Sequence, residues 1–150
     1  MIEKETVLKF LRKNKVATLA TVTPDGMPHA DTIYFLVEDN FHLFFPTKKL
    51  TQKFKNIHHK NDVVLVVTDV VKKQTVSIKG QAFEHTIDSM SDCLERVAAM
   101  LNSDDTEDID TVFPIMQRND GDLTVVTIRP SSIRYTEYGV HGLQEQTFTL

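Results

Sequence analysis

The sequence contains one cysteine, no long apolar run and no excess of positive charge. Cys93 has no second cysteine with which to form an internal disulfide, which agrees with a reducing compartment. No apolar run approaches the ~20 residues that a membrane-spanning helix needs, and the opening MIEKETVLKFLRKNK lacks the apolar core of a signal peptide. We therefore expect a cytoplasmic protein without a membrane partner.

The charge of the chain argues against nucleic-acid binding but leaves room for a local anion site. The net charge is −4, whereas a nucleic-acid binder usually needs a basic footprint. Residues 46–60 nevertheless hold five lysines and no acid, and residues 84–122 hold eleven acids against two arginines. An anion site inside an acidic protein is consistent with this distribution.

The length of 150 residues and the hydrophobic content of 41% correspond to one domain, over residues 1–150. Apolar spacings of three and four predict helices near the start, at 50–59 and after Thr86. Runs of β-branched and aromatic residues predict strands at 16–23, 29–37, 41–45, 63–71, 75–85, 123–129 and 132–138. We expect Pro46 to end the third strand and 63–71 to be buried on both faces.

The order of these elements predicts a mainly β (α+β) fold of six to seven antiparallel strands with short flanking helices. Turn sequences such as Pro24-Asp25-Gly26 and Asn119-Asp120-Gly121-Asp122 join neighbouring strands as hairpins. Closure into a small barrel removes the exposed edges of such a sheet.

The stretch FFPTKKLTQK (44–53) combines a strand end, a turn and a helix start. The N-terminus of a helix carries partial positive charge, so neighbouring lysines are unfavourable there unless an anion is bound. Thr47 and Thr51 offer hydroxyl donors, and Lys53 offers a point charge. A phosphate site and a solvated basic helix face with threonine caps explain this pattern equally well.

The run Phe45, Thr47-x3-Thr51-x-Lys53 follows a Gly-x-Pro-His strand and precedes KNI and NDV. The order and spacing of these motifs resemble the pyridoxamine 5'-phosphate oxidase-like family of FMN-binding split barrels, over nearly the whole chain. The resemblance implies a split barrel that forms a homodimer with flavin at the interface.

The resemblance also implies roles for individual residues. The family's turn clasps the FMN phosphate, which assigns that contact to Thr47, Thr51 and Lys53, with Lys48 as an additional cation. The family's second strand lays its backbone along the flavin, and Phe45 and Pro46 would lie at the flavin's edge. The strand residues are Asp31, Thr32, Ile33 and Tyr34, of which Ile33 fits a barrel core equally well.

Three departures separate this chain from true pyridoxamine 5'-phosphate oxidases. Those enzymes carry Arg, Lys and Arg where this chain has Asp31, Leu36 and Gln52, and a phosphorylated substrate needs such cations. The segment 139–150 also has no equivalent of the oxidases' Arg-Leu-x-Pro substrate motif. We expect a different activity.

The other motifs are weaker. His58 and His59 are adjacent and would project in different directions from a helix, and no set of residues has metal-site spacing. His29 and His85 lie on predicted strands, where half-buried polar residues are commoner than proton donors. No Rossmann or P-loop glycine pattern is present.

We expect an FMN-dependent oxidoreductase that acts on a small organic substrate, with an electron donor such as NAD(P)H. The alternative is a flavin- or haem-binding protein of the same fold, for storage, sensing or electron transfer. The deazaflavin F420 is a third possibility, which the acid-rich second half disfavours. The catalytic residues remain unknown, because the hard chemistry would belong to the cofactor.

Overall fold

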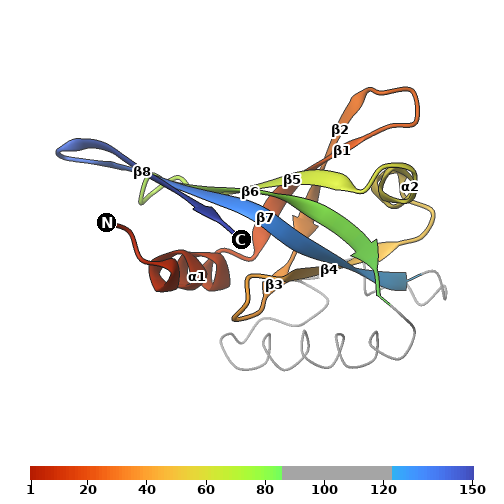
Figure 1. Cartoon of the computed structure of the whole chain (residues 1–150). Helices are drawn as coiled ribbons and strands as arrows, with labels where there is room; N and C mark the ends of the chain where they lie inside the picture. The colour runs from red at the N-terminus through yellow and green to blue at the C-terminus, as the bar shows by residue number, and fades with distance from the viewer. Residues whose placement is uncertain (86–122) are drawn as a thin grey trace.

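The computed structural model describes residues 1–85 and 123–150 of the chain. Within them, eight strands form one antiparallel sheet, and two helices flank it (Figure 1). The helix predicted after Thr86, the acidic loop 103–110 and the turn 119–122 lie outside the described residues. In chain order, the elements are α1 (Lys4–Lys13), β1 (Val16–Val22), β2 (Pro28–Tyr34), β3 (Leu36–Val37), β4 (Leu43–Lys48), α2 (Gln52–His59), β5 (Asp62–Asp69), β6 (Gln74–Glu84), β7 (Leu123–Gly139) and β8 (Gly142–Thr149).

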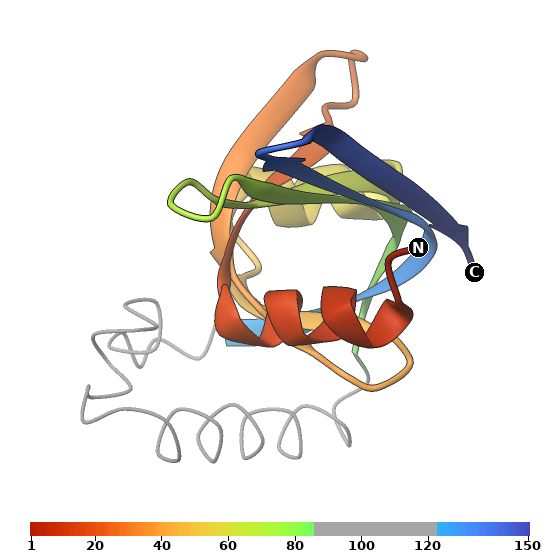
Figure 2. The ribbon, with the colours of Figure 1, turned by 90° about the vertical axis from the view of Figure 1, so that its left-hand side faces the viewer.

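The sheet curls back on itself through the segment that joins its two ends. Its strand order is β2-β1-β5-β6-β7-β4-β3, with β8 paired to β7. Because β2 and β3 are separated only by Phe35, one continuous segment belongs to both ends of the sheet. The strands curl around the interior of the molecule (Figure 2), and their buried side chains form the core there. The predicted split barrel is confirmed.

The two helices lie at opposite ends of the curled sheet (Figures 1 and 2). The predicted spacing places Val7, Leu8, Phe10 and Leu11 on the buried face of α1. The buried face of α2 contains Phe54, Asn56 and Ile57. The barrel interior is filled by strand residues of alternating orientation, including Leu19, Leu65, Val76, Ile78 and Ile128.

Two predictions about individual strands are wrong. Pro46 does not end the third strand, because β4 continues to Lys48 and Pro46 pairs with Val125. On the other side of β4, β3 pairs only with Leu43 and Phe44, so a proline on that edge removes no ladder hydrogen bond. The strand predicted to be buried on both faces, β5, alternates instead between buried and exposed positions.

The end of the chain also differs from the prediction. The segments 123–129 and 132–138 form one strand, β7, which accommodates a register shift opposite Lys79 and Gly80. The segment after Gly139, for which no element was predicted, returns as β8 along β7. Leu143 and its exposed neighbours give β8 no apolar face, which explains why hydrophobic periodicity did not reveal it.

Among the described residues, none of the helices has the length and apolar character required to span a bilayer.

Candidate functional site

The turn between β4 and α2 brings two threonine hydroxyls together. Thr47 is fully buried at the end of β4, and its Oγ1 lies 3.2 Å from Oγ1 of Thr51. Thr51 occupies the N-cap position of α2, but its hydroxyl donates to the Lys48 carbonyl oxygen at 2.7 Å instead of capping the helix. The backbone amides of the first turn of α2 therefore lie beside these hydroxyls without a side-chain cap from Thr51.

Lys53 reaches from α2 to the neighbouring strand β2. Its Nζ lies 3.8 Å from Oδ2 of Asp31, and its side chain is only 13% exposed. The same Asp31 oxygen lies 2.9 Å from Nε2 of His29. One carboxylate oxygen is thus shared between an imidazole and an ammonium group.

A second carboxylate, Glu84 at the end of β6, meets the other side of the turn. Its Oε1 lies 3.7 Å from Nζ of Lys49 and accepts a 3.0 Å hydrogen bond from the Thr124 hydroxyl. Its Oε2 lies 3.4 Å from Nε2 of His58. The sequence has no acidic residue within 46–60. In the folded protein, however, Lys49 and Lys53 each lie beside a carboxylate, so the expectation of unpaired lysines is wrong. Asp31 and Glu84 lie far from residues 46–60 in sequence, so no local pattern indicated either pairing.

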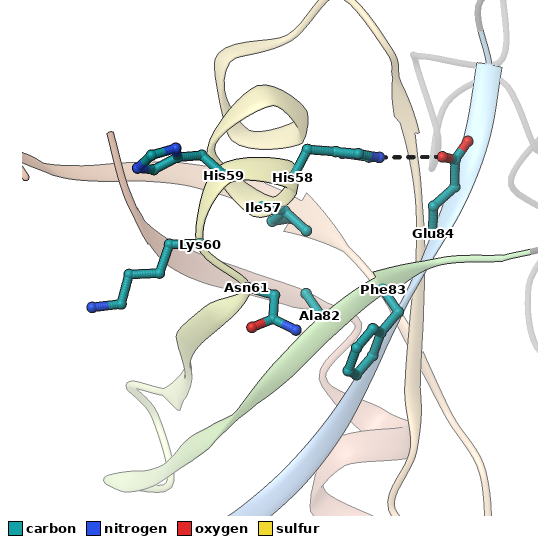
Figure 3. A pocket seen from close by; sticks show the side chains of 8 residues that line it. All are labelled: Ile57, His58, His59, Lys60, Asn61, Ala82, Phe83 and Glu84. Atoms are coloured by element: carbon teal, nitrogen blue, oxygen red, sulfur yellow. Dashed lines mark ion pairs between the residues drawn. The ribbon is translucent and has the colours of Figure 1, made fainter. Parts of the chain in front are cut away.

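Glu84 and His58 also border a pocket of about 410 Å³ beside the C-terminal end of α2 (Figure 3). His58 points toward Glu84, whereas His59 and Lys60 point away from it, as expected for successive residues leaving a helix. Nδ1 of His58 lies 3.0 Å from the Phe54 carbonyl oxygen, so each ring nitrogen faces an oxygen atom of the protein. The pocket is lined by Ile57, His58, His59, Lys60, Asn61, Ala82, Phe83 and Glu84.

The structure separates the predicted site residues into two groups. The turn residues gather around the hydroxyls described above, with Lys48 half-buried at the end of β4. Phe45, Pro46 and Ile33 are buried, and Phe45 and Ile33 belong to the hydrophobic core. The side chain of Ile33 therefore packs in the barrel core, which was one of its two predicted roles.

Among the described strands, β2 has a partner along one edge only. β2 pairs with β1 alone among the described strands, so its second edge has no strand partner there. Thr32 is exposed and Tyr34 is half-buried along this strand. A flat ligand placed against that edge would meet backbone groups rather than a covering strand.

His85 directly follows the end of β6 and contacts side chains of β4 and β7. Its ring stacks on Phe44 with centroids 5.0 Å apart, and Nε2 contacts the Thr127 hydroxyl. Burial lowers the pKa of His85, with a smaller opposing effect of Glu38. This arrangement corresponds to a half-buried polar residue that favours the neutral ring.

Comparison with known proteins identifies related sequences and folds. The family model described as pyridoxamine 5'-phosphate oxidase matches residues 3–137. No curated protein matches the chain. Among solved structures, General Stress Protein 26 from Bacillus anthracis str. Sterne is 16% identical, with 98% of each chain covered and a TM-score of 0.67.

Two further solved structures share the fold and differ in the ligand that their descriptions name. A pyridoxamine 5'-phosphate oxidase-related, FMN-binding protein from Nostoc punctiforme PCC 73102 is 15% identical, covering 98% of this chain and 96% of its own, with a TM-score of 0.67. A haem-binding protein from Mycobacterium smegmatis is 18% identical, covering 99% of this chain and 60% of its own, with a TM-score of 0.66. At these identities the likeness establishes the fold alone.

Proposed function

Because the chain belongs to the pyridoxamine 5'-phosphate oxidase family, we propose that it binds FMN and acts as a flavin-dependent oxidoreductase on a small organic substrate. The observation that carries the proposal is the turn at the start of α2. There, Thr47 and Thr51 hydroxyls lie 3.2 Å apart beside the amides of a helix N-terminus. A solvent-facing basic helix would not need a fully buried Thr47 at this position.

The donor set of the turn fits a phosphate group. Phosphate oxygens accept hydrogen bonds from hydroxyls, backbone amides and ammonium groups, and the helix dipole favours negative charge at this end. Thr47, Thr51 and Lys53 would hold the phosphate, and Lys48 would add positive charge. The first turn of α2 contains no acidic residue that would oppose this binding.

The protein's own contribution would be to bind and orient the cofactor. The open backbone edge of β2, over Asp31, Thr32, Ile33 and Tyr34, would face the flavin ring and ribityl chain. Phe45 and Pro46 would lie at the ring's edge and support that edge from within the barrel, since both side chains are buried in β4. When bound, FMN supplies the transfer of electrons or hydride from a donor such as NAD(P)H to an acceptor.

The site lacks the cations that a phosphorylated vitamin substrate needs. Leu36 is buried in β3, and Gln52 donates to Oδ1 of Asn56 at 2.8 Å, so neither position offers a charge. At the third of these positions, Asp31 carries a negative charge in place of a cation. These features support a substrate other than pyridoxamine 5'-phosphate.

We also propose that the chain forms a homodimer. The outer face of β1 and β5 exposes apolar residues that a monomer would leave in water, among them Val16 at 48% and Val66 at 37%. A groove of about 740 Å³ adjoins this face and is lined by Ala20, Val22 and Val64 together with residues of β6 and β7. A second copy of the chain would cover this surface. Light scattering of the purified protein measures the mass of the particle in solution, which is expected to be that of two chains.

The alternative is a carrier of flavin or haem without turnover, which the fold shared with the haem-binding protein from Mycobacterium smegmatis favours. Heat denaturation of the purified protein followed by mass spectrometry of the released ligand tests both. Release of FMN supports the proposal, and release of haem or F420 contradicts it. Anaerobic addition of NADH or NADPH then separates the two flavin functions, because bleaching of the flavin bands favours the enzyme.

A further inference from the structure

Asp31 already pairs with Lys53, the cation that a bound phosphate would also contact. Its Oδ2 lies 3.8 Å from Nζ of Lys53 and 2.9 Å from Nε2 of His29. Lys53 is the less exposed partner, at 13% against 34% for Asp31. A lysine with so little exposure requires a counter-charge, because burial of an unpaired ammonium group is costly.

A phosphate bound at Thr47 and Thr51 would need the same ammonium group. Lys53 follows Thr51 by two residues on α2, so the hydroxyl and the ammonium group serve one end of the helix. A phosphate held by Lys53 would draw the ammonium group away from the Asp31 carboxylate, so the attraction within that 3.8 Å pair would be lost. Binding of the phosphate and retention of the Asp31 pair are therefore in competition.

We propose that Asp31 is an internal counter-ion of Lys53 that competes with the ligand's phosphate and thereby weakens the binding of phosphorylated ligands at this turn. The inference rests on the proposed function, because the phosphate concerned is that of FMN. It makes Asp31 a specificity-determining residue: the carboxylate reduces the advantage of FMN over riboflavin. It also disfavours ligands that would bring a second phosphate to β2.

Glu84 provides a matched comparison beside the same turn, because it is not among the residues proposed to hold FMN. It also pairs with a lysine of the turn, with Oε1 at 3.7 Å from Nζ of Lys49. Lys49 is 50% exposed, and Glu84 is held in addition by Thr124 and His58. Removal of the Glu84 charge changes the net charge as much as removal of the Asp31 charge, but leaves the Lys53 pair intact.

The test measures the affinities of FMN and riboflavin for the purified protein, by quenching of flavin fluorescence. Asp31→Asn is expected to bind FMN roughly tenfold more tightly than the wild type, because one nearby charge at an intermediate dielectric has an effect of this size. Riboflavin affinity is expected to change less than about twofold, since riboflavin has no phosphate. Glu84→Gln is expected to leave both affinities within about threefold, because exposed pairs contribute little.

A second pair of variants tests whether the effect passes through Lys53. In a Lys53→Ala background, Asp31→Asn is expected to lose most of its gain for FMN, because there is no ammonium group left to compete for. If Asp31→Asn increased the FMN affinity just as much in the Lys53→Ala protein, competition for Lys53 would be overturned. The effect would then be assigned to direct repulsion between Asp31 and the phosphate. Asp31→Ser serves as the second variant if Asp31→Asn does not fold, with the same expected result.

The remaining outcomes separate this inference from the proposed function. Wild-type protein that binds FMN, together with Asp31→Asn that binds it equally or more weakly, would overturn the role of Asp31 and leave the proposed function standing. Equal gains from Asp31→Asn and Glu84→Gln would assign the effect to net charge and also overturn it. Wild-type and Asp31→Asn proteins that both fail to bind FMN would overturn both.

Discussion

Nδ2 of Asn56 donates a 3.0 Å hydrogen bond to Oγ1 of Thr21, and both side chains are buried. This contact fastens α2 to β1 across a separation of 35 residues. Oδ1 of Asn56 accepts in turn from Nε2 of Gln52 at the first position of the helix. The orientation of the start of α2, and with it the position of Lys53, depends on this buried amide.

Replacement of Asn56 by alanine is expected to lower the free energy of unfolding by about 1–3 kcal/mol, because it leaves the buried Thr21 hydroxyl without this donor. Urea denaturation measures the change. Lys55→Ala is the control, since Lys55 is exposed on the same helix and its replacement should cost less than about 0.5 kcal/mol. Equal losses for the two variants would show that the contact contributes nothing specific.

The sequence predicted those parts of the fold that local patterns encode. The spacing of Val7, Leu8 and Leu11 predicted α1, and runs of β-branched and aromatic residues predicted most strands. Such runs did not predict that β4 continues through Pro46, because the tolerance of a proline depends on which edge of β4 has a partner. That edge is decided by the short extent of β3, which is a property of the whole sheet.

The candidate site was predictable as a segment but not as a charge arrangement. Thr47, Thr51 and Lys53 follow one another along the chain, so their proximity follows from a turn and one helical turn. Asp31 and Glu84 reach the site from β2 and β6, and their pairing with lysines depends on the register of distant strands. The aligned family motif identified position 31, but it gave no information about the partner of its carboxylate.

Gly80→Ala is expected to destabilise the protein by about 1–3 kcal/mol, because the backbone has no space for a side chain at this bulge. A Cβ atom on residue 80 would lie 2.3 Å from the carbonyl oxygen of Arg129, which is too close for any real contact. Gly139→Ala is the control, since its Cβ would lie 4.0 Å from its nearest neighbour, the Gly142 carbonyl oxygen. Thermal unfolding compares the two variants, and an unchanged midpoint for Gly80→Ala would contradict the bulge geometry.

Tyr135 is expected to make stability fall at high pH. Burial, together with the hydrogen bond that its hydroxyl donates to Oε2 of Glu137 at 2.9 Å, raises the pKa of Tyr135 to about 12. An unfolded tyrosine loses its proton near pH 10, so between about pH 10 and 12 the unfolded state binds fewer protons than the folded state. The free energy of unfolding then decreases by up to about 1.4 kcal/mol per pH unit.

The comparison of Tyr135→Phe with Tyr138→Phe isolates this contribution. Tyr135→Phe removes the titrating group and should flatten the decrease above pH 10, although loss of the hydrogen bond lowers stability at neutral pH by about 1 kcal/mol. Tyr138 is 57% exposed, and its replacement should leave the pH dependence as in the wild type. Parallel curves for wild type and Tyr135→Phe above pH 10 would refute the raised pKa.

Lys53→Ala is expected to weaken FMN binding by roughly tenfold or more, because it removes the charge-assisted contact to the phosphate. Riboflavin has no phosphate, so its affinity should change little, and the ratio of the two affinities isolates the phosphate contact from damage to the flavin pocket. Lys55→Ala removes the same charge from the exposed face of α2, and should leave that ratio near the wild-type value. Equal losses for FMN and riboflavin in Lys53→Ala would place the phosphate elsewhere, since a group that holds the phosphate must distinguish the ligand that carries one.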